Sequence, residues 1–263
     1  MDNNNTSPIW VDTPAAAESA MEQIIQSTVA GYDSEFEGVD LSAESCVGKS
    51  KLDVFSIAVP TKTLKPLGYF EPRAWVFEGN LIRESSVKSY LEDGTYRKVI
   101  HNRPVDEHTA FNAGVCIRGG LCTLNMARFI YPERANLIRG NYDLDSLCRW
   151  RVDRGKTEDF DDLLGYDDWE PYECDAEANY CLACEDFGCR KKKPPHDNKV
   201  KRIRTVTRNK KVRRIRNLAD IRPGHELFER YKIYAAVDAE LALILYQMML
   251  IDGQKERWYP WGL

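Results

Sequence analysis

The sequence lacks both a long apolar run and an apolar amino-terminal segment. Its longest apolar stretch, residues 241–251, is interrupted by Gln247 and is shorter than the roughly 18 residues that a membrane span requires. Residues 1–8 are polar and have neither the basic start nor the apolar core of a secretory signal. We therefore expect an intracellular protein that is not secreted and has no membrane partner.

Because the interior of a cell is reducing, the eight cysteines are not expected to form a disulfide framework. Half of them are scattered, as is typical of small buried thiols. The other half lie within 16 residues, and their middle pair has Cys-x2-Cys spacing; they are Cys174, Cys181, Cys184 and Cys189. Four thiolates are able to hold one structural Zn²⁺ ion, and four free thiols are the alternative.

Charge is distributed unevenly, although the net charge is only −4. Residues 157–186 contain twelve acids and no Lys or Arg, whereas residues 190–216 contain fourteen bases and one acid. The basic runs 200–207 and 212–216 flank residues 208–211, which predicts a basic β-hairpin with its turn at 208–211. A solvated surface is the ordinary interpretation of such a run. We favour a phosphate-binding surface here, with nucleic-acid contacts from Arg202, Arg204, Arg213 and Arg214.

Hydrophobic periodicity predicts an α/β domain around a mixed sheet. Strands are expected at 28–36, 52–59, 74–77 and 97–101, and helices at 84–91, 105–113, 123–130, from 143 onward, and at 225–250. The predicted organisation is a flexible arm at 1–20, a main domain at 21–154 and 223–252, and an insertion at 155–222.

Two carboxylates lie two residues apart on the first long strand. Because residues i and i+2 of a strand face the same side, Asp33 and Glu35 are expected to project together. Neighbouring carboxylates repel each other unless a cation neutralises them, and divalent cations such as Mg²⁺ prefer oxygen ligands. Taken alone, the pair is more often a chance feature of the surface.

Two further acids are expected near this pair. Asp106 follows a strand and a tight turn, so it should lie near the carboxyl end of the sheet, where open α/β sheets bind ligands. Its alternative role is that of a first-turn acid favoured by the helix dipole. Tyr234 and Asp238 are i and i+4 on an apolar helix and should face the same place. Burying such an acid without a partner is costly.

Together these segments resemble the three motifs of the DEDD superfamily of 3′→5′ exonucleases, in the branch with a motif tyrosine. Asp33-Ser-Glu35-Phe is similar to the first motif of ribonuclease D. Asn102-x-x-x-Asp106 is similar to the second motif in the proofreading domain of family A DNA polymerases, and Tyr234-x-x-x-Asp238 to the third motif. The resemblance implies a ribonuclease H-like fold, with a mixed five-stranded sheet flanked by helices. The cysteine-rich, basic insertion at 155–222 departs from the family, because it is much longer than the link in its simplest members.

The resemblance also implies a two-metal mechanism with Mg²⁺ or Mn²⁺. Asp33 is expected to bridge both ions, Glu35 and Asp238 to complete one site, and Asp106 to support the other. Tyr234 is expected to position the attacking water, and Asn102 to contact the terminal nucleotide. No acid lies in the Gly-Leu-Cys-Thr segment at 120–123, where family members commonly carry one.

The implied substrate is a single-stranded DNA 3′ end, with RNA as the alternative. Because the chain is too short to include a polymerase, an enzyme that acts alone or proofreads for a DNA polymerase in trans is expected. Ribonuclease D-like trimming of RNA 3′ ends is one rival function. A catalytically inactive nuclease fold that binds nucleic acid is another, and the four intact acids count against it.

Overall fold

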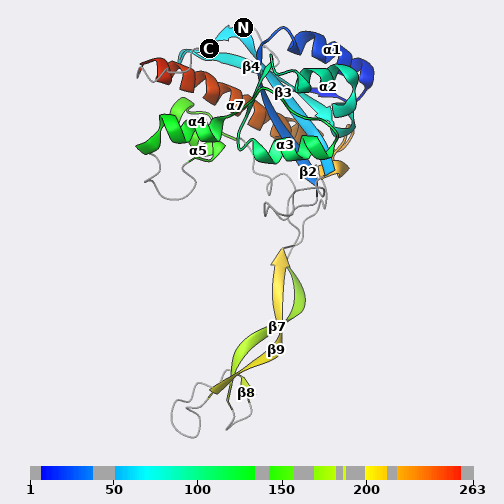
Figure 1. The fold of residues 1–263 in the computed structure, drawn as a ribbon. Helices are drawn as coiled ribbons and strands as arrows, with labels where there is room; N and C mark the ends of the chain where they lie inside the picture. The colour runs from blue at the N-terminus through cyan, green and yellow to red at the C-terminus, as the bar shows by residue number, and fades with distance from the viewer. Residues whose placement is uncertain are drawn as a thin grey trace. The chain divides into compact units, whose positions relative to one another are not determined.

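The computed structural model describes residues 7–37, 51–133, 142–156, 169–181, 186–187, 199–211 and 218–255. The chain divides into two compact units. The first, here called the sheet unit, comprises Met1–Leu163 and Asn217–Leu263, and the second, the hairpin unit, comprises Leu164–Arg216 (Figure 1). Each unit is described by itself.

The sheet unit is built around a six-stranded mixed sheet in the order β1-β4-β3-β2-β5-β6. The strands are β1 (Ile9–Val11), β2 (Val29–Glu37), β3 (Lys51–Leu64), β4 (Phe70–Glu78), β5 (Arg97–Ile100) and β6 (Gly120–Cys122). The helices are α1 (Pro14–Ile24), α2 (Ser85–Glu92), α3 (Pro104–Asn112), α4 (Thr123–Ile130), α5 (Leu144–Val152) and α7 (Phe228–Lys255). The pairs β2–β3 and β3–β4 are antiparallel, whereas β1–β4, β2–β5 and β5–β6 are parallel.

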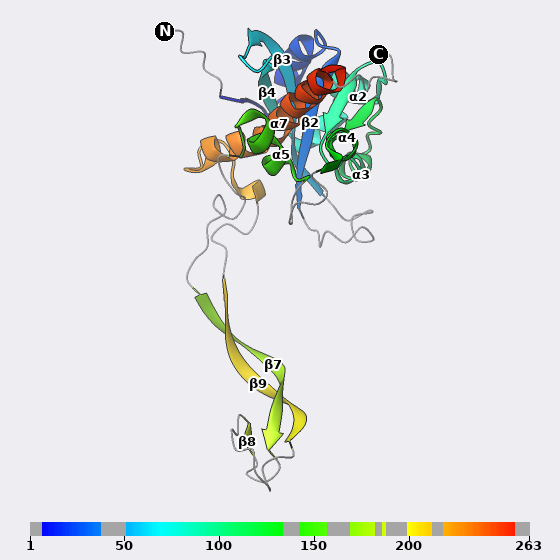
Figure 2. The same ribbon diagram turned by 90° about the vertical axis from the view of Figure 1, so that its left-hand side faces the viewer.

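Alternation along the strands supplies a core on each face of this sheet. On β2, Ala30 and Tyr32 join the cluster that includes residues of α1, α2 and α3. The opposite face is covered by α7, which packs with α4 and α5 in a separate apolar cluster. Figures 1 and 2 show α7 lying along the sheet. The predicted α/β fold class is therefore confirmed.

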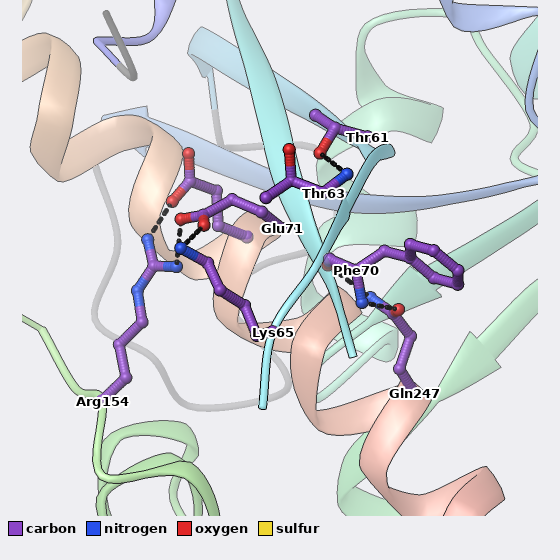
Figure 3. Close-up of polar contacts among 8 residues, drawn as sticks. Thr61, Thr63, Lys65, Phe70, Glu71, Arg154 and Gln247 are labelled. Atoms are coloured by element: carbon purple, nitrogen blue, oxygen red, sulfur yellow. Dashed lines mark hydrogen bonds and ion pairs between the residues drawn. The ribbon is translucent and has the colours of Figure 1, made fainter. Parts of the chain in front are cut away.

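Helix α7 is long and apolar enough to cross a membrane by length and composition alone. However, 72% of its most apolar window is buried within the structure. Its apolar side chains are therefore accounted for by packing on the sheet. At its far end, the Gln247 amide accepts a hydrogen bond from the Phe70 N–H (2.7 Å) and donates one to the Phe70 carbonyl (3.2 Å), as Figure 3 illustrates.

Gly31 of β2 lies at the closest approach of this strand to α7. A Cβ atom at this position would overlap the Ala239 carbonyl oxygen and approach Leu243 Cβ at 3.2 Å. Ala239 directly follows Asp238, and Gly31 lies two residues before Asp33. The absence of a side chain at Gly31 thus brings the acids of β2 and α7 near one another.

The flexible arm predicted at 1–20 is wrong for the described part of that segment, and the sheet has six strands where five were expected. Residues 9–11 form β1, and α1 begins after Thr13, whose Oγ1 accepts a hydrogen bond from Ala16 N (3.2 Å). A threonine N-cap followed by proline is a standard helix start. Strands β1 and β6 have three residues each, too short for alternation to reveal them.

The hairpin unit contains a three-stranded sheet in the order β8-β7-β9. Its strands are β7 (Trp169–Cys181), β8 (Asp186–Phe187) and β9 (Lys199–Lys211). Strands β7 and β9 are paired without interruption from Trp169–Lys211 to Cys181–Lys199. The turn predicted at 208–211 is therefore wrong: this segment belongs to β9, which pairs with the acidic segment instead of folding on itself. Arg213 and Arg214 lie outside the described residues.

The predicted four-cysteine zinc site gains no support from the hairpin unit and stays a prediction. Cys174 and Cys181 both lie on β7, seven residues apart, which corresponds to about 23 Å along a strand. Because zinc–sulfur bonds are only about 2.3 Å long, a shared ion would require these two residues to lie much closer together than a continuous strand places them. Cys184 and Cys189 lie outside the described residues.

Candidate active site

The central strand of the sheet carries the first pair of acids. Asp33 lies opposite Ser56 and Glu35 opposite Val54 on β3, and a register shift follows Glu35. Both acids are partly exposed. They lie on the face of β2 that also contains Gly31 and packs against α7, because strand side chains alternate. The sequence prediction that Asp33 and Glu35 share a face agrees with this arrangement.

Asp106 reaches the same strand from the first turn of α3 and is only 4% exposed. Its Oδ1 accepts hydrogen bonds from the backbone N–H of Ser34 (2.9 Å) and from the Ser34 hydroxyl (2.7 Å). Burial raises the pKa of Asp106 to about 7, although the hydrogen bonds from Ser34 oppose this rise. Ser34 thus connects Asp106 to the backbone between Asp33 and Glu35.

Tyr234 and Asp238 approach from α7, one helical turn apart. Asp238 Oδ2 accepts a hydrogen bond from the Lys156 ammonium group at 2.5 Å. Its other oxygen, Oδ1, is buried and has no hydrogen-bond partner among the residues that the structure describes. Burial raises the pKa of Asp238, and the positive charge of Lys156 opposes that rise.

The four acids are close enough to affect one another electrostatically. The pKa of Asp33 is well above its ordinary value because of burial, with further increases from Asp106, Asp238 and Glu35. Burial, followed by the charge of Asp238, raises the pKa of Glu35 to about 8. Such mutual shifts mean that full ionisation of the cluster requires more positive charge than one lysine provides.

The hydroxyl of Tyr234 belongs to the same cluster. Its pKa is raised, mainly by burial and next by the charges of Glu35, Asp238 and Asp33, with a contribution from its hydrogen bond to Glu35. Tyr234 therefore remains protonated at neutral pH. A neutral phenol beside carboxylates serves as a hydrogen-bond donor, which suits the orientation of a water molecule or phosphate oxygen.

Lys156 is a member of the site that the sequence did not reveal. Its backbone N–H donates to Asp145 Oδ1 (2.6 Å), and its carbonyl accepts from Arg149 Nη2 (2.7 Å). Two residues earlier, Arg154 binds Glu240 at 2.7 Å. The pairs 154–240 and 156–238 thus run side by side between this segment and α7. Figure 3 shows Arg154 directed toward Glu71 of β4 as well (3.7 Å).

A second network fixes the beginning of α7 to β3. Asp53 is 8% exposed, and its two oxygens accept hydrogen bonds from Arg222 (2.5 Å) and from the Tyr231 hydroxyl (2.7 Å). Tyr231 lies three residues before Tyr234, so this network helps to set the position of Tyr234. The charge of Asp53 also contributes to the raised pKa of Glu35.

The residues predicted to contact nucleic acid lie in different parts of the fold. Asn102 is exposed in the turn between β5 and α3, with a positive φ of 57°. Beside it, His101 Nδ1 lies 3.0 Å from the Thr123 hydroxyl, and burial lowers the pKa of His101 to about 4. Arg202 and Arg204 lie on β9 and belong to the hairpin unit, whereas the acid cluster belongs to the sheet unit.

The described residues contain no group of three or more His, Cys, Asp or Glu side chains already arranged to hold a metal ion. The acids are instead directed toward Ser34, Tyr234 and Lys156. The oxygen ligands expected from the sequence are thus near one another, but their present contacts are to protein groups.

Comparison with solved structures identifies the fold. The chain is similar to Escherichia coli RNase D, an exoribonuclease involved in structured RNA processing, with 14% identity, a TM-score of 0.54, and coverage of 96% of this chain and 47% of that one. It is also similar to Trypanosoma brucei RNase D in a GMP complex (13% identity, TM-score 0.55, 93% and 57% coverage). The catalytic core of Trypanosoma brucei RRP6, mutant C496S, gives 12% identity, a TM-score of 0.51, and 97% and 53% coverage.

These similarities establish that the chain has the fold of the RNase D and RRP6 structures, which agrees with the resemblance of its motifs to 3′→5′ exonucleases. The chain spans about half the length of these solved structures. No protein-family model and no curated protein sequence matches it.

Proposed function

We propose that this protein is a metal-dependent 3′→5′ exonuclease that removes nucleotides from single-stranded ends. The observation that carries the proposal is the convergence of Asp33, Glu35, Asp106 and Asp238 from β2, α3 and α7. Besides burial, the charges of Asp106, Asp238 and Glu35 raise the pKa of Asp33, and the charge of Asp238 also raises those of Glu35 and Asp106. Groups of mutually perturbed carboxylates are typical of functional sites. A stable core would gain nothing from four such acids.

The donor set suits Mg²⁺ or Mn²⁺, because all four side chains supply hard oxygen ligands. The buried Oδ1 of Asp238, which has no hydrogen-bond partner in the part of the chain that the structure describes, is a ligand atom that a cation would satisfy. Asp33, Glu35 and Asp238 would hold one ion, and Asp33 and Asp106 would support a second. The bound ions would supply Lewis-acid polarisation of the phosphate and a more acidic water.

The protein's own groups prepare this chemistry in several ways. Ser34 fixes the orientation of Asp106 through two hydrogen bonds, so that this carboxylate does not need to be ordered at the moment of reaction. The protonated Tyr234 hydroxyl orients water toward the scissile phosphate. Lys156 neutralises part of the acid cluster and holds Asp238 in place. Asn102, exposed at its turn, would contact the terminal nucleotide.

The substrate is proposed to be single-stranded nucleic acid, with two candidate chemistries. DNA follows from the Asn102-x-x-x-Asp106 motif, and RNA is favoured by the similarity of the fold to RNase D and RRP6. The polymerase partner expected from the sequence gains no support from these comparisons and is not part of the proposal. Nor is a structural zinc ion, since the register of β7 separates two of its four expected ligands.

The test is a time course of purified protein with single-stranded DNA and RNA oligonucleotides that carry a fluorophore at either end. We expect stepwise shortening from the 3′ end with Mg²⁺ or Mn²⁺ and none in EDTA. Comparison of the two rates assigns DNA or RNA. Cleavage that starts at the 5′ end, or full activity in chelator, contradicts the proposal, and binding without cleavage supports the inactive-module alternative.

A further inference from the structure

Lys156 is held at the acid cluster by a short segment, residues 153–156, which follows α5 and is here called the strap. It begins at Asp153, whose φ of 52° ends the helix in a left-handed conformation. Both backbone polar groups of Lys156 are bonded to α5: its N–H donates to Asp145 Oδ1 (2.6 Å), and its carbonyl accepts from Arg149 Nη2 (2.7 Å). The backbone of Lys156 is therefore fixed independently of what its side chain contacts.

The strap is also joined to the rest of the sheet unit by a residue other than Lys156. Arg154 lies 2.7 Å from Glu240 of α7 and 3.7 Å from Glu71 of β4 (Figure 3). Neither glutamate belongs to the four acids of the cluster. Because the contacts of Arg154 hold the strap in place, the ion pair of Lys156 is not required for its attachment.

The side chain of Lys156 carries its charge into the acid cluster. Its ammonium group donates to Asp238 Oδ2 (2.5 Å), and the side chain is 25% exposed. Burial lowers the pKa of Lys156, but the charge of Asp238, the hydrogen bond to it, and the charges of Asp33 and Glu35 outweigh this effect and raise the pKa. The lysine is thus protonated at neutral pH and interacts with three of the four acids.

This lysine balances only part of the charge of the cluster. The four ionised carboxylates carry four negative charges, and Lys156 supplies one positive charge. Two divalent cations would balance the carboxylates by themselves, and their charge would repel an ammonium group on Asp238. Since the side chain is partly exposed and its four-carbon stem is flexible, the ammonium group is able to leave Asp238 while the backbone stays fixed.

We infer that Lys156 exchanges one anion for another: it binds Asp238 in the metal-free protein and the phosphate of the terminal nucleotide when divalent cations occupy the acids. The inference rests on the proposed function, which brings a phosphate to the cluster. A lysine ammonium group has three hydrogen-bond donors and no acceptor, and phosphate is an anion that it commonly binds. Lys156 would therefore bind substrate in addition to serving as the counter-ion of Asp238.

Two effects of opposite sign follow from this exchange. Removing the Lys156 ammonium group should favour the binding of divalent cations, because they no longer compete with it for Asp238. The same change should weaken the binding of a nucleotide, because a contact to its phosphate is lost. A lysine that only stabilises the structure would change both affinities in the same direction.

The test is titration calorimetry of the full chain carrying Lys156→Met. Mn²⁺ is added to metal-free protein, and thymidine or uridine 5′-monophosphate is added to Mn²⁺-saturated protein. We expect Mn²⁺ to bind about tenfold more tightly than to the parent protein and either nucleotide to bind about fivefold or more weakly, each equivalent to one hydrogen bond to a charged group. Arg154→Met, which removes one positive charge from the same strap, is the matched control and should change each affinity by less than about threefold.

Mn²⁺ affinity that is unchanged or weaker in Lys156→Met would overturn the inference, as would nucleotide affinity equal to that of the parent protein. Equal shifts in Lys156→Met and Arg154→Met would also overturn it, because loss of any charge from the strap would then be sufficient. Lys156→Ala should reproduce both effects, and circular dichroism checks that each variant is folded.

The nuclease assignment is tested separately by cleavage. A parent protein that shortens 3′ ends, with a Lys156→Met variant that lacks the two opposed effects, overturns only the exchange of partners by Lys156. A parent protein that binds no Mn²⁺ contradicts both the exchange and the proposed function.

Discussion

The sheet unit and the hairpin unit use charge in different ways. In the sheet unit, charged side chains of the site have specific partners at short distances, namely Lys156 with Asp238 (2.5 Å) and Asp106 with Ser34 (2.7 Å). In the hairpin unit, the register of β7 and β9 places only one acid, Glu170, opposite a base, Lys210. Substitutions in the sheet unit should therefore have large, specific effects, whereas those in the hairpin unit should be small and additive.

The largest effect is expected at the acid cluster. Asp33→Ala should reduce cleavage about a thousandfold or more, because it removes both a metal ligand and charge directed at the transition state. Asp12→Ala, at an exposed position between β1 and α1, is the control and should retain the parent rate. Rates are measured by release of the 3′ nucleotide under single-turnover conditions. Residual activity within tenfold of the parent protein would remove Asp33 from the mechanism.

Tyr234→Phe should have a smaller effect on the same reaction. It removes one hydroxyl and leaves the ring, so a loss of about tenfold is expected, equivalent to one hydrogen bond. Binding of Mn²⁺, followed by titration calorimetry, should be unchanged. A variant that cleaves at the parent rate would show that the hydroxyl of Tyr234 has no role in the reaction.

Lys156→Met tests whether the lysine stabilises the acid cluster. Without metal, the variant should be less stable by about 1–3 kcal/mol, because Asp238 loses its charged partner. Mn²⁺ should then raise the melting temperature more in the variant than in the parent protein, since the ion supplies the missing positive charge. Lys88→Met, which removes an exposed lysine of α2, is the control. An equal Mn²⁺ shift in both proteins would contradict this role.

Metal-free protein should lose stability as pH rises from about 5 to about 8. Glu35 and Asp106 have folded-state pKa values of about 8 and about 7, above those of an unfolded chain. The folded state therefore binds more protons in this range, so the free energy of unfolding falls as pH increases. Saturating Mn²⁺ should reduce this dependence. Urea unfolding at several pH values measures it, and constant stability in EDTA would count against the shifts.

The smallest effect is expected in the hairpin unit. Arg204→Gln alone should weaken binding of oligo(dT) only about two- to fivefold, as is usual for one exposed charge. The comparison substitution, Lys201→Gln, removes a charge from the same strand at a residue that was not predicted to contact nucleic acid, and should have less effect. A loss of a hundredfold from Arg204 alone would mean that the hairpin unit has a specific site, and the contrast between the two units would disappear.

Much of the sheet unit was predictable because its signals are local. The spacing of Asp33 and Glu35 on a strand and of Tyr234 and Asp238 on a helix follows from backbone periodicity. Lys156 was not predictable, because its place beside Asp238 depends on contacts 82 residues apart. The strands β1 and β6 were too short for a pattern, and the α1 cap at Thr13 was read as part of a flexible arm.

The structure of the hairpin unit was harder to predict from the sequence. Its composition was clear, but the partner of each strand was not, because register depends on pairing between distant segments. Residues 208–211 contain polar residues that suit a turn, and their pairing with residues 169–172 of β7 was not visible from the sequence. The zinc site also stays a prediction, since it depends on distances that composition does not contain.

The close approach of Gly31 to Ala239 has a consequence for ion size. Mg²⁺ requires nearly ideal octahedral geometry at about 2.1 Å, whereas larger divalent ions accept longer and less regular bonds. A methyl group at Gly31 would force the Ala239 backbone away from β2 and, with it, the adjacent Asp238 away from Asp33. The selectivity of the site between small and large cations would then be set by a residue that supplies no ligand at all.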